Sequence, residues 1–351
     1  MKSVRHSILP RRQFLRISSQ ATTALAISIG SEFRVRAAGV SENYSGLETE
    51  KFLETVRVET RINDKKVFTE GPAADRGGNL YFTNVPVAKI LKWSPRRKEL
   101  SVFRENSNEA NGLLFEPDGS LLACEGGAGR VTRTNMRTGK ISVLASSFND
   151  SPLGAPNDLT RDAKGRIYFT SRFGNTRPDT GNVDSVYRID PSGKITRIVS
   201  DPATRKPNGI VTSPDQRHLY LIEAHPLAHL PRNIQVFDLM ENGSVRNQRP
   251  LIEFYPGRSG DGMCIDERGN LYVAAGLHRT RKTSETLDTR PGIHVISPAG
   301  KLLAFRETPE DTITNCTFGG EDLRTLYVTC GTYLLSIRTK IPGKADYRPG
   351  A

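Results

Sequence analysis

Ala163-Lys-Gly-Arg-Ile-Tyr-Phe-Thr170 is a Lys-Gly turn followed by an alternating apolar run, and this phrase decides the fold because the chain repeats it. A Gly-containing turn between two apolar runs is typical of a hairpin of antiparallel strands. The phrase occurs six times, with Gly or a polar residue in the turn. Its equivalent apolar positions are Tyr81, Leu122, Tyr168, Tyr220, Tyr272 and Tyr327.

The spacing of the six phrases indicates the architecture. Successive positions lie 41, 46, 52, 52 and 55 residues apart, and a four-stranded propeller blade needs roughly 40 to 50 residues. A second pair of strand-like runs follows each phrase, as at 129–133, 185–189 and 292–296. We therefore predict an all-β fold, a six-bladed β-propeller of four-stranded antiparallel blades. An all-β sandwich is the alternative, and six phrases at this spacing argue against it.

The start of the chain differs from the rest. A twin-arginine motif at 11–16 precedes an apolar stretch at 21–30, and small residues suited to signal-peptidase cleavage follow at 35–38. This pattern predicts a signal peptide that the twin-arginine export machinery recognises, with cleavage near Ala37-Ala38. The mature protein would then be periplasmic or extracellular. An ordinary export signal or an uncleaved anchor is the alternative.

The remaining chain divides around the repeats. We expect a signal peptide over 1–38, an N-terminal extension over 39–55, the propeller over 56–340 and a C-terminal tail over 341–351. No other stretch approaches 18 consecutive apolar residues, so we expect no stable insertion into a membrane.

Charge and cysteine usage exclude two classes of function. The formal net charge is +12, and the leader holds seven basic residues and one acidic residue, so its removal halves that charge. The other basic residues are scattered and form no stripe with interleaved aromatic residues, so we expect no nucleic-acid partner. The four cysteines lie far apart without zinc-ligand spacing; one disulfide is possible but not required.

The candidate site lies just before the repeated phrases. In a propeller, the loops that enter the innermost strands converge at one end of the central channel. Each blade places one Asn, Asp or Glu at this point: Glu70, Asn111, Asn157, Asn208, Asp261 and Asn315. A ring of carboxylate and amide oxygens suits a hard divalent cation such as Ca²⁺. The alternative is that Asn-Gly and Pro-Asn are only turn chemistry, which six phrases in register disfavour.

These phrases also carry a resemblance to a known family. The motifs are Glu70-Gly-Pro72, Pro156-Asn157-Asp158, Pro207-Asn208-Gly209, Asp261-Gly-Met-Cys-Ile-Asp266 and Thr314-Asn-Cys-Thr-Phe-Gly-Gly320. Their order and spacing resemble those of the senescence marker protein / gluconolactonase / luciferin-regenerating enzyme family, from about residue 50 to 340.

The resemblance implies both a metal site and an activity. It implies one divalent ion, Ca²⁺ first and Zn²⁺, Mn²⁺ or Mg²⁺ as alternatives, held by Glu70, Asn157, Asn208 and Asp261. It further implies hydrolysis of a small lactone or ester, with Asp261 as general base on the attacking water.

Two departures from the family pattern affect the substrate. Animal members carry Arg where this chain has Ala155, and bacterial members often carry His where it has Gly126. The resemblance therefore does not single out gluconolactone. Arg172, Glu223, His225 and His278 are expected to follow innermost strands and to be able to line the mouth. The candidate substrate contacts are Asn111, Glu125, Arg172, His225 and Asn315.

Two other functions are compatible with a propeller, because this fold hosts many activities. One is a metal-stabilised binding propeller without turnover, which would not need the full set of four ligands with carboxylates. The other is a quinone-dependent sugar oxidase, which would need several basic residues and His on the axis that this sequence lacks.

Overall fold

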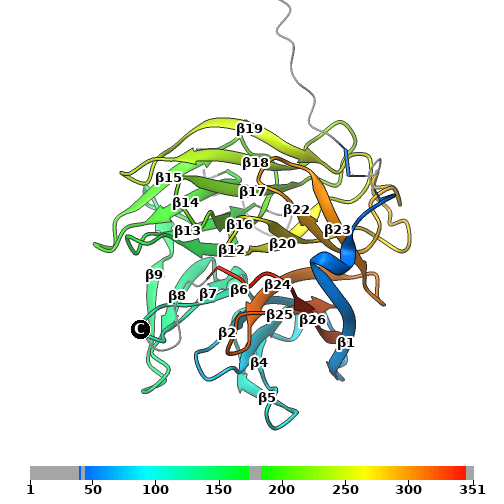
Figure 1. Ribbon diagram of the computed structural model, residues 1–351. Helices are drawn as coiled ribbons and strands as arrows, with labels where there is room; N and C mark the ends of the chain where they lie inside the picture. Colours follow the sequence, from blue (N-terminus) through cyan, green and yellow to red (C-terminus); the bar gives the residue numbers. More distant parts are fainter. Residues whose placement is uncertain (1–38, 41–43, 174–182, 345–351) are drawn as a thin grey trace, which may run out of the picture. The chain divides into compact units, whose positions relative to one another are not determined.

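The computed structural model describes residues 39–40, 44–173 and 183–344. The predicted twin-arginine motif and the cleavage site at Ala37-Ala38 lie outside these residues. The described chain forms six four-stranded antiparallel sheets, and each runs from an innermost to an outermost strand (Figure 1). The predicted six-bladed β-propeller is confirmed.

Five blades are built from consecutive strands. The first holds β2 (Thr69–Ala74), β3 (Leu80–Asn84), β4 (Lys89–Ser94) and β5 (Glu99–Arg104), and the second β6 (Ala110–Phe115), β7 (Leu121–Glu125), β8 (Arg130–Thr134) and β9 (Ile141–Ala145). The third holds β12 (Ala155–Arg161), β13 (Ile167–Arg172), β14 (Ser185–Ile189) and β15 (Ile195–Ser200). The fourth holds β16 (Pro207–Thr212), β17 (His218–Ala224), β18 (Arg232–Leu239) and β19 (Val245–Glu253), and the fifth β20 (Gly260–Ile265), β21 (Leu271–Ala275), β22 (Gly292–Ile296) and β23 (Leu302–Glu307).

The sixth blade joins the two ends of the propeller. It holds β24 (Ile313–Gly319), β25 (Thr325–Cys330) and β26 (Tyr333–Thr339), and its outermost strand is β1 (Leu53–Arg61). In that pairing Leu53 lies opposite Thr339. The propeller therefore begins at Leu53, slightly before the predicted boundary at 56. The remaining short elements are β10 (Ser147–Phe148), β11 (Ser151–Pro152), and the 3-10 helices η1 (Thr49–Lys51), η2 (Val85–Val87) and η3 (Gly126–Ala128).

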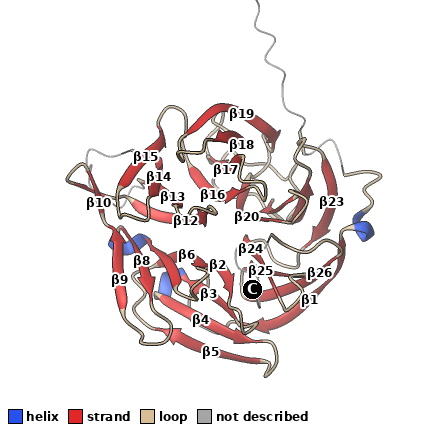
Figure 2. Ribbon diagram, turned by 60° about the vertical axis from the view of Figure 1, so that its left-hand side comes forward, coloured by secondary structure: helices blue, strands red, loops and turns tan. Residues whose placement is uncertain are grey.

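The innermost strands β2, β6, β12, β16, β20 and β24 each contact the next and surround the axis (Figure 2). The repeated phrase forms the turn after each of them and then the second strand of the blade. Two sequence-based placements need correction for this reason. The polar site positions lie within the first residues of the innermost strands and not in the loops before them. Arg172 is the last residue of a second strand and does not follow an innermost one, and second strands run back to the same end because the pairing is antiparallel.

The core lies between neighbouring blades. The six equivalent apolar positions are all buried on the second strands. Tyr272 packs edge-to-face on Phe318 of the next blade, with ring centroids 5.0 Å apart. Tyr327 packs with Ala74 and Leu80 of the first blade across the ring closure. The repeat was detectable because one bulky side chain per blade fills each interface.

The described part of the C-terminal tail binds to the ends of innermost strands, at the end of the propeller opposite the site positions. The backbone N–H of Gly343 donates to Leu323 O at 2.8 Å, and that of Lys344 donates to Ile265 O at 2.9 Å. The Lys344 ammonium donates to Thr212 Oγ1 at 2.8 Å. Three blades are thereby tied together at the end of their innermost strands.

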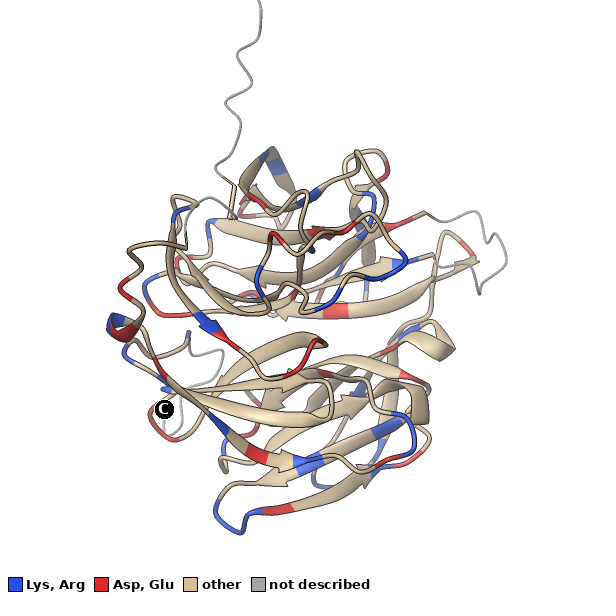
Figure 3. Cartoon of the chain, turned by 90° about the vertical axis from the view of Figure 1, so that its right-hand side faces the viewer, with Lys and Arg blue, Asp and Glu red and all other residues tan. Residues whose placement is uncertain are grey.

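The surface carries both signs of charge. Figure 3 shows basic and acidic positions interspersed over the visible blades. No helix in the described part of the chain is long and apolar enough to cross a membrane.

Candidate metal and substrate site

The six polar positions converge because each occupies the second or third residue of an innermost strand. All six blades have a register shift between the first and second strands at this point, as between Glu70 and Ala73 and between Gly260 and Met263. A β-bulge re-aims side chains out of simple alternation, and bulges are common beside functional sites. Here they turn carboxylates and amides toward the axis.

Four of these polar residues are followed by Gly, and the reason is a close approach between blades. A Cβ on Gly71 would lie 2.1 Å from the backbone oxygen of Asn111, and one on Gly262 would lie 2.0 Å from Cγ of Asn315. Such distances are impossible for a side chain. The Gly residues let the innermost strands pack tightly around the axis, and the phrases form the starts of strands and not turns.

Asp261 accepts one hydrogen bond on each oxygen of its carboxylate. Asn208 Nδ2 donates to its Oδ1 at 2.5 Å. The Arg258 guanidinium donates to its Oδ2 at 2.5 Å and to the backbone oxygen of Ile313 at 3.0 Å. Arg258 is buried and was not among the sequence-based candidates. Its place three residues before Asp261 gave no signal, because a loop side chain has no predictable direction.

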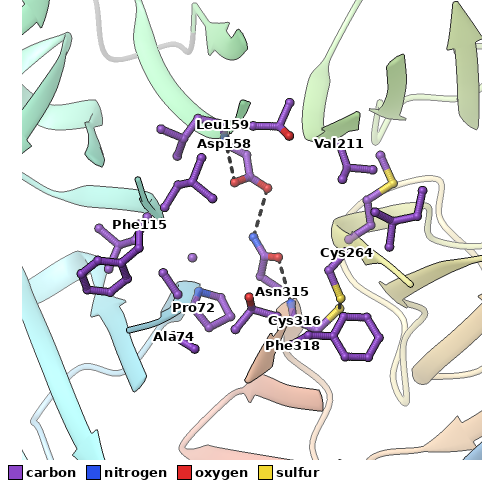
Figure 4. Close-up of a pocket in the computed structure, with 18 of the residues that line it drawn as sticks. Pro72, Ala74, Phe115, Asp158, Leu159, Val211, Cys264, Asn315, Cys316 and Phe318 are labelled. Atoms are coloured by element: carbon purple, nitrogen blue, oxygen red, sulfur yellow. Dashed lines mark hydrogen bonds between the residues drawn. The ribbon is translucent and has the colours of Figure 1, made fainter. Parts of the chain in front are cut away.

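A second polar chain crosses the axis (Figure 4). Asn315 Nδ2 donates to Asp158 Oδ2 at 3.1 Å and lies 3.4 Å from Glu70 Oε2. The predicted substrate contact Asn315 therefore links two buried carboxyl groups. Asp158 was part of the quoted Pro-Asn-Asp motif but was not selected as a site residue. The signal that could have found it is a carboxylate at the position where four other blades have Gly.

Three acidic residues of this cluster, Glu70, Asp158 and Asp261, lie close enough to affect one another's charge. Burial, followed by the charges of Asp261 and Asp158, raises the pKa of Glu70 well above its usual range. Burial raises the pKa of Asp158 to about 7, although hydrogen bonds from Asn315 and from the backbone of Leu159 lower it. A buried charge without a partner is unfavourable. The cluster is therefore suited to a bound cation.

The donor set fits a hard divalent cation. Asn157 Oδ1 is buried and accepts no hydrogen bond from any described residue, and the same holds for Asn111 Oδ1. Unused amide oxygens beside the carboxylates of Glu70 and Asp261 are the oxygen ligands that Ca²⁺ prefers. Over 39–40, 44–173 and 183–344, no three His, Cys, Asp or Glu side chains form a metal cluster. Any ion would therefore rely on the amides as well.

Two cavities meet this ring of side chains. The mouth cavity has a volume of about 570 Å³, and its lining includes Asn111, Asn157 and Arg172. The channel cavity has a volume of about 100 Å³ and runs from Asp158 and Asn315 toward the C-terminal tail. The mouth cavity is the larger space and has room for a small molecule.

Comparison with known proteins identifies the family of this chain. The profile of the SMP-30/Gluconolactonase/LRE-like region matches residues 68–332. The chain belongs to the SMP-30/Gluconolactonase/LRE-like family.

Individual members of the SMP-30/Gluconolactonase/LRE-like family are distant relatives. The chain is 28% identical to the gluconolactonase of Zymomonas mobilis over 305 residues, which cover 79% of this chain and 80% of the relative. The solved structure of a gluconolactonase from Xanthomonas campestris is similar with a TM-score of 0.66 and 24% identity, covering 82% of this chain and 95% of that one. A calcium-binding protein, regucalcin, from Agrobacterium tumefaciens is similar with a TM-score of 0.65 and 19% identity, covering 84% and 96%. The two structures support the fold alone.

Glu125, predicted to contact substrate, has a structural place in this family member. It ends β7 and is fully buried. Its Oε1 accepts from Arg104 at 2.7 Å and from Thr132 at 2.9 Å, while its Oε2 accepts from Arg130 and Asn108, each at 2.8 Å. Both carboxylate oxygens are thus saturated by the protein. The prediction is corrected because the second blade uses this glutamate to hold its own strands.

Three other residues expected at the mouth, Glu223, His225 and His278, do not line the mouth cavity. The Nδ1 of His225 accepts from the backbone of Leu227 at 3.2 Å. Glu223 accepts from Thr204 and from the backbone N–H groups of 205 and 206, which fixes the loop before β16. The His278 ring contacts Thr308 O at 2.8 Å. Of the four residues expected at the mouth, all of them described by the structure, only Arg172 lines the mouth cavity.

Proposed function

We propose that the protein hydrolyses a small lactone or ester with the help of one divalent cation, Ca²⁺ first. The observation that carries this proposal is the ring of buried polar groups on the innermost strands, in which burial and the charge of Asp261 raise the pKa of Glu70 and Asn157 Oδ1 accepts no hydrogen bond from a described residue. Membership in the SMP-30/Gluconolactonase/LRE-like family and the Zymomonas relative, named a gluconolactonase, support a lactonase-type hydrolase.

Four residues would hold the ion. The two carboxylates of Glu70 and Asp261 would balance its +2 charge, and the amides of Asn157 and Asn208 would add neutral ligands. When bound, the ion supplies Lewis-acid polarisation of the substrate carbonyl and stabilises the oxyanion that develops on it.

Asp261 acts as general base in this proposal. A water oxygen forms a bond to the carbonyl carbon while Asp261 takes a proton from that water. The carbon–oxygen bond of the ester then breaks, and Asp261 returns the proton to the departing alkoxide. The hydrogen bond from Arg258 Nη2 orients the carboxylate for both transfers.

The mouth cavity would select the substrate. Asn111 and Arg172 lie on its lining together with Asn157, and they offer hydrogen bonds to hydroxyl groups of a ligand. A volume of about 570 Å³ is within the range of small-molecule sites. A sugar lactone is the substrate class that fits both the polar lining and the size.

A lactone panel tests the proposal. The purified protein is assayed against sugar lactones and simple esters, with Ca²⁺, Zn²⁺, Mn²⁺ or Mg²⁺ and with excess EDTA. We expect turnover of at least one lactone that EDTA abolishes and one of the ions restores. Metal binding without turnover of any substrate would instead support a binding propeller.

The leader extends the proposal to location. We propose export of the folded protein by the twin-arginine machinery, because the motif at 11–16 precedes a short apolar stretch. Replacement of Arg11 and Arg12 by Lys is expected to retain precursor in the cytoplasm. Unchanged export would overturn this part alone.

A further inference from the structure

Two thiols face one another at the axis. Cys264 lies on β20 and Cys316 on β24, which are neighbouring innermost strands of the fifth and sixth blades. Their Sγ atoms are 3.5 Å apart (Figure 4). Both cysteines line the channel cavity. Cys316 is buried and Cys264 is partly exposed, so the pair can be reached from the cavity.

The two sulfur atoms are in van der Waals contact but not bonded. A disulfide bond is about 2.05 Å long, so the two sulfur atoms need to approach by about 1.5 Å. The Cys316 thiol also contacts Tyr272 O at 3.2 Å, and formation of the bond exchanges that contact for the second sulfur. Cys124 and Cys330, the other two thiols of the chain, are buried elsewhere, and among the described residues no other pair of sulfur atoms is in contact.

We propose that Cys264 and Cys316 form an intrachain disulfide when the protein meets a disulfide oxidant. One thiolate attacks a sulfur of the oxidant and forms a mixed disulfide, releasing the first oxidant thiol. The second cysteine thiolate then attacks the cysteine sulfur of this mixed disulfide and releases the other oxidant thiol. The protein loses two protons and two electrons, and the oxidant disulfide is reduced to two thiols.

The cross-link has a defined place in the ring. It joins the strand that carries Asp261 to the strand that carries Asn315, each within three residues of a bridged cysteine. It spans 52 residues of chain, and a cross-link of this length restricts the unfolded chain. Oxidation therefore fastens the innermost edges of two blades. This inference does not depend on the proposed hydrolysis.

Peptide mapping of the oxidised protein tests the proposal. The four cysteines fall in four different tryptic peptides, 105–130, 259–268, 307–324 and 325–338. The purified full chain is fully reduced, exposed to oxidised glutathione under native conditions, then denatured, alkylated and digested. We expect two of the four thiols to be lost, a mass lower by about 2 Da from the two hydrogens removed, and one linked species of peptides 259–268 and 307–324.

Matched variants provide the controls. Cys124→Ser and Cys330→Ser should still lose two thiols, whereas Cys316→Ser should form no intrachain link. The midpoint of thermal unfolding should rise by several degrees on oxidation of the wild type and stay constant in Cys316→Ser. Four persisting thiols in the wild type, or a link that includes peptide 105–130 or 325–338, would overturn the proposal without reliance on any variant.

Discussion

Glu70 and Glu125 are both buried glutamates at the same end of neighbouring blades, yet their surroundings are opposite. Glu125 accepts hydrogen bonds from Arg104 and Arg130. Burial tends to raise its pKa, but the bonds from these two arginines leave the pKa below its usual value. Glu70 has two further acids as neighbours, and its pKa is raised.

The difference separates a structural acid from a ligand-binding acid. Glu125 has two arginine partners and two hydrogen bonds on each of its oxygens, so it is already satisfied and has no capacity for a ligand. A buried carboxylate among other carboxylates is unfavourable until a cation arrives. Sequence position alone placed both glutamates at the mouth, and only their neighbours distinguish them.

The largest expected effect is on turnover. Asp261→Asn removes the base but keeps an oxygen ligand, and loss of a general base typically costs about 10² to 10⁴ in rate. Asn208→Ala removes a neutral ligand and should be partly rescued by added metal. A metal titration of lactone hydrolysis compares both variants with wild type. Glu125→Gln is the control, with wild-type turnover per folded molecule. If Asp261→Asn keeps near-normal turnover at saturating metal, Asp261 is not the general base, and Glu70 becomes the next candidate.

The next effect is on stability. Glu125→Gln leaves two arginines without their carboxylate, and breaking a buried ion pair costs about 3 to 5 kcal/mol. We expect the lower end, because the Arg130 side chain is 32% exposed. Glu70→Gln should leave the free energy of unfolding unchanged or higher in the absence of metal, because the raised pKa of Glu70 shows that burying its carboxyl group is unfavourable and Gln carries no such cost. Urea unfolding in EDTA measures both. If both variants lower the free energy of unfolding equally, Glu70 and Glu125 do not differ as a ligand-binding and a structural acid.

The pH dependence should differ in sign between the two clusters. The pKa of Asp158 is raised to about 7 in the folded state, so the folded protein holds a proton that the unfolded chain releases near pH 4. The metal-free protein should therefore lose stability as the pH rises from 4 through 7, by up to about 1.4 kcal/mol per pH unit. Glu125, with a lowered pKa, stabilises the fold above its unfolded pKa, and this contribution is lost as the pH falls through its folded pKa.

Urea midpoints from about pH 2 to 8 measure this dependence, because the contribution of Glu125 is lost only below the usual pKa of a Glu. Asp158→Asn should flatten the rise in stability toward low pH, and Glu125→Gln should remove only the decline below pH 5. If the urea midpoint of Asp158→Asn in EDTA depends on pH as that of the wild type does, ionisation of Asp158 does not destabilise the folded protein.

The smallest effect should come from Arg130. Its side chain is partly exposed and Arg104 still neutralises Glu125, so Arg130→Gln should lower the free energy of unfolding by about 1 kcal/mol or less. Arg104→Gln, at the more buried side chain, should cost more. An equal or larger loss for Arg130→Gln in the same urea series would show that the exposed partner dominates the cluster.

The fold could be predicted from the sequence because each blade repeats one large apolar residue, such as Tyr168 or Tyr272, after a turn. The convergence of the six polar positions could be predicted for the same reason. Asp158 was missed because strand alternation places adjacent residues on opposite faces, whereas the bulge after Pro156 breaks that alternation. The role of Glu125 was missed because Arg104 and Arg130 lie on different strands, and their spacing does not reveal the pairing.

The ring of blades can close only late in folding, because β1 from the start of the propeller pairs with β26 from its end. Leu53 meets its partner only after residue 339 has been synthesised, so closure must bring together sites separated by most of the chain, a slow step for β proteins. Until then, the edges of β1 and β25 lack a partner strand, and such edges invite association with other chains. A chain whose synthesis ends before β26 would hold five complete blades and would expose two unpaired strand edges, on β1 and β25, to other chains.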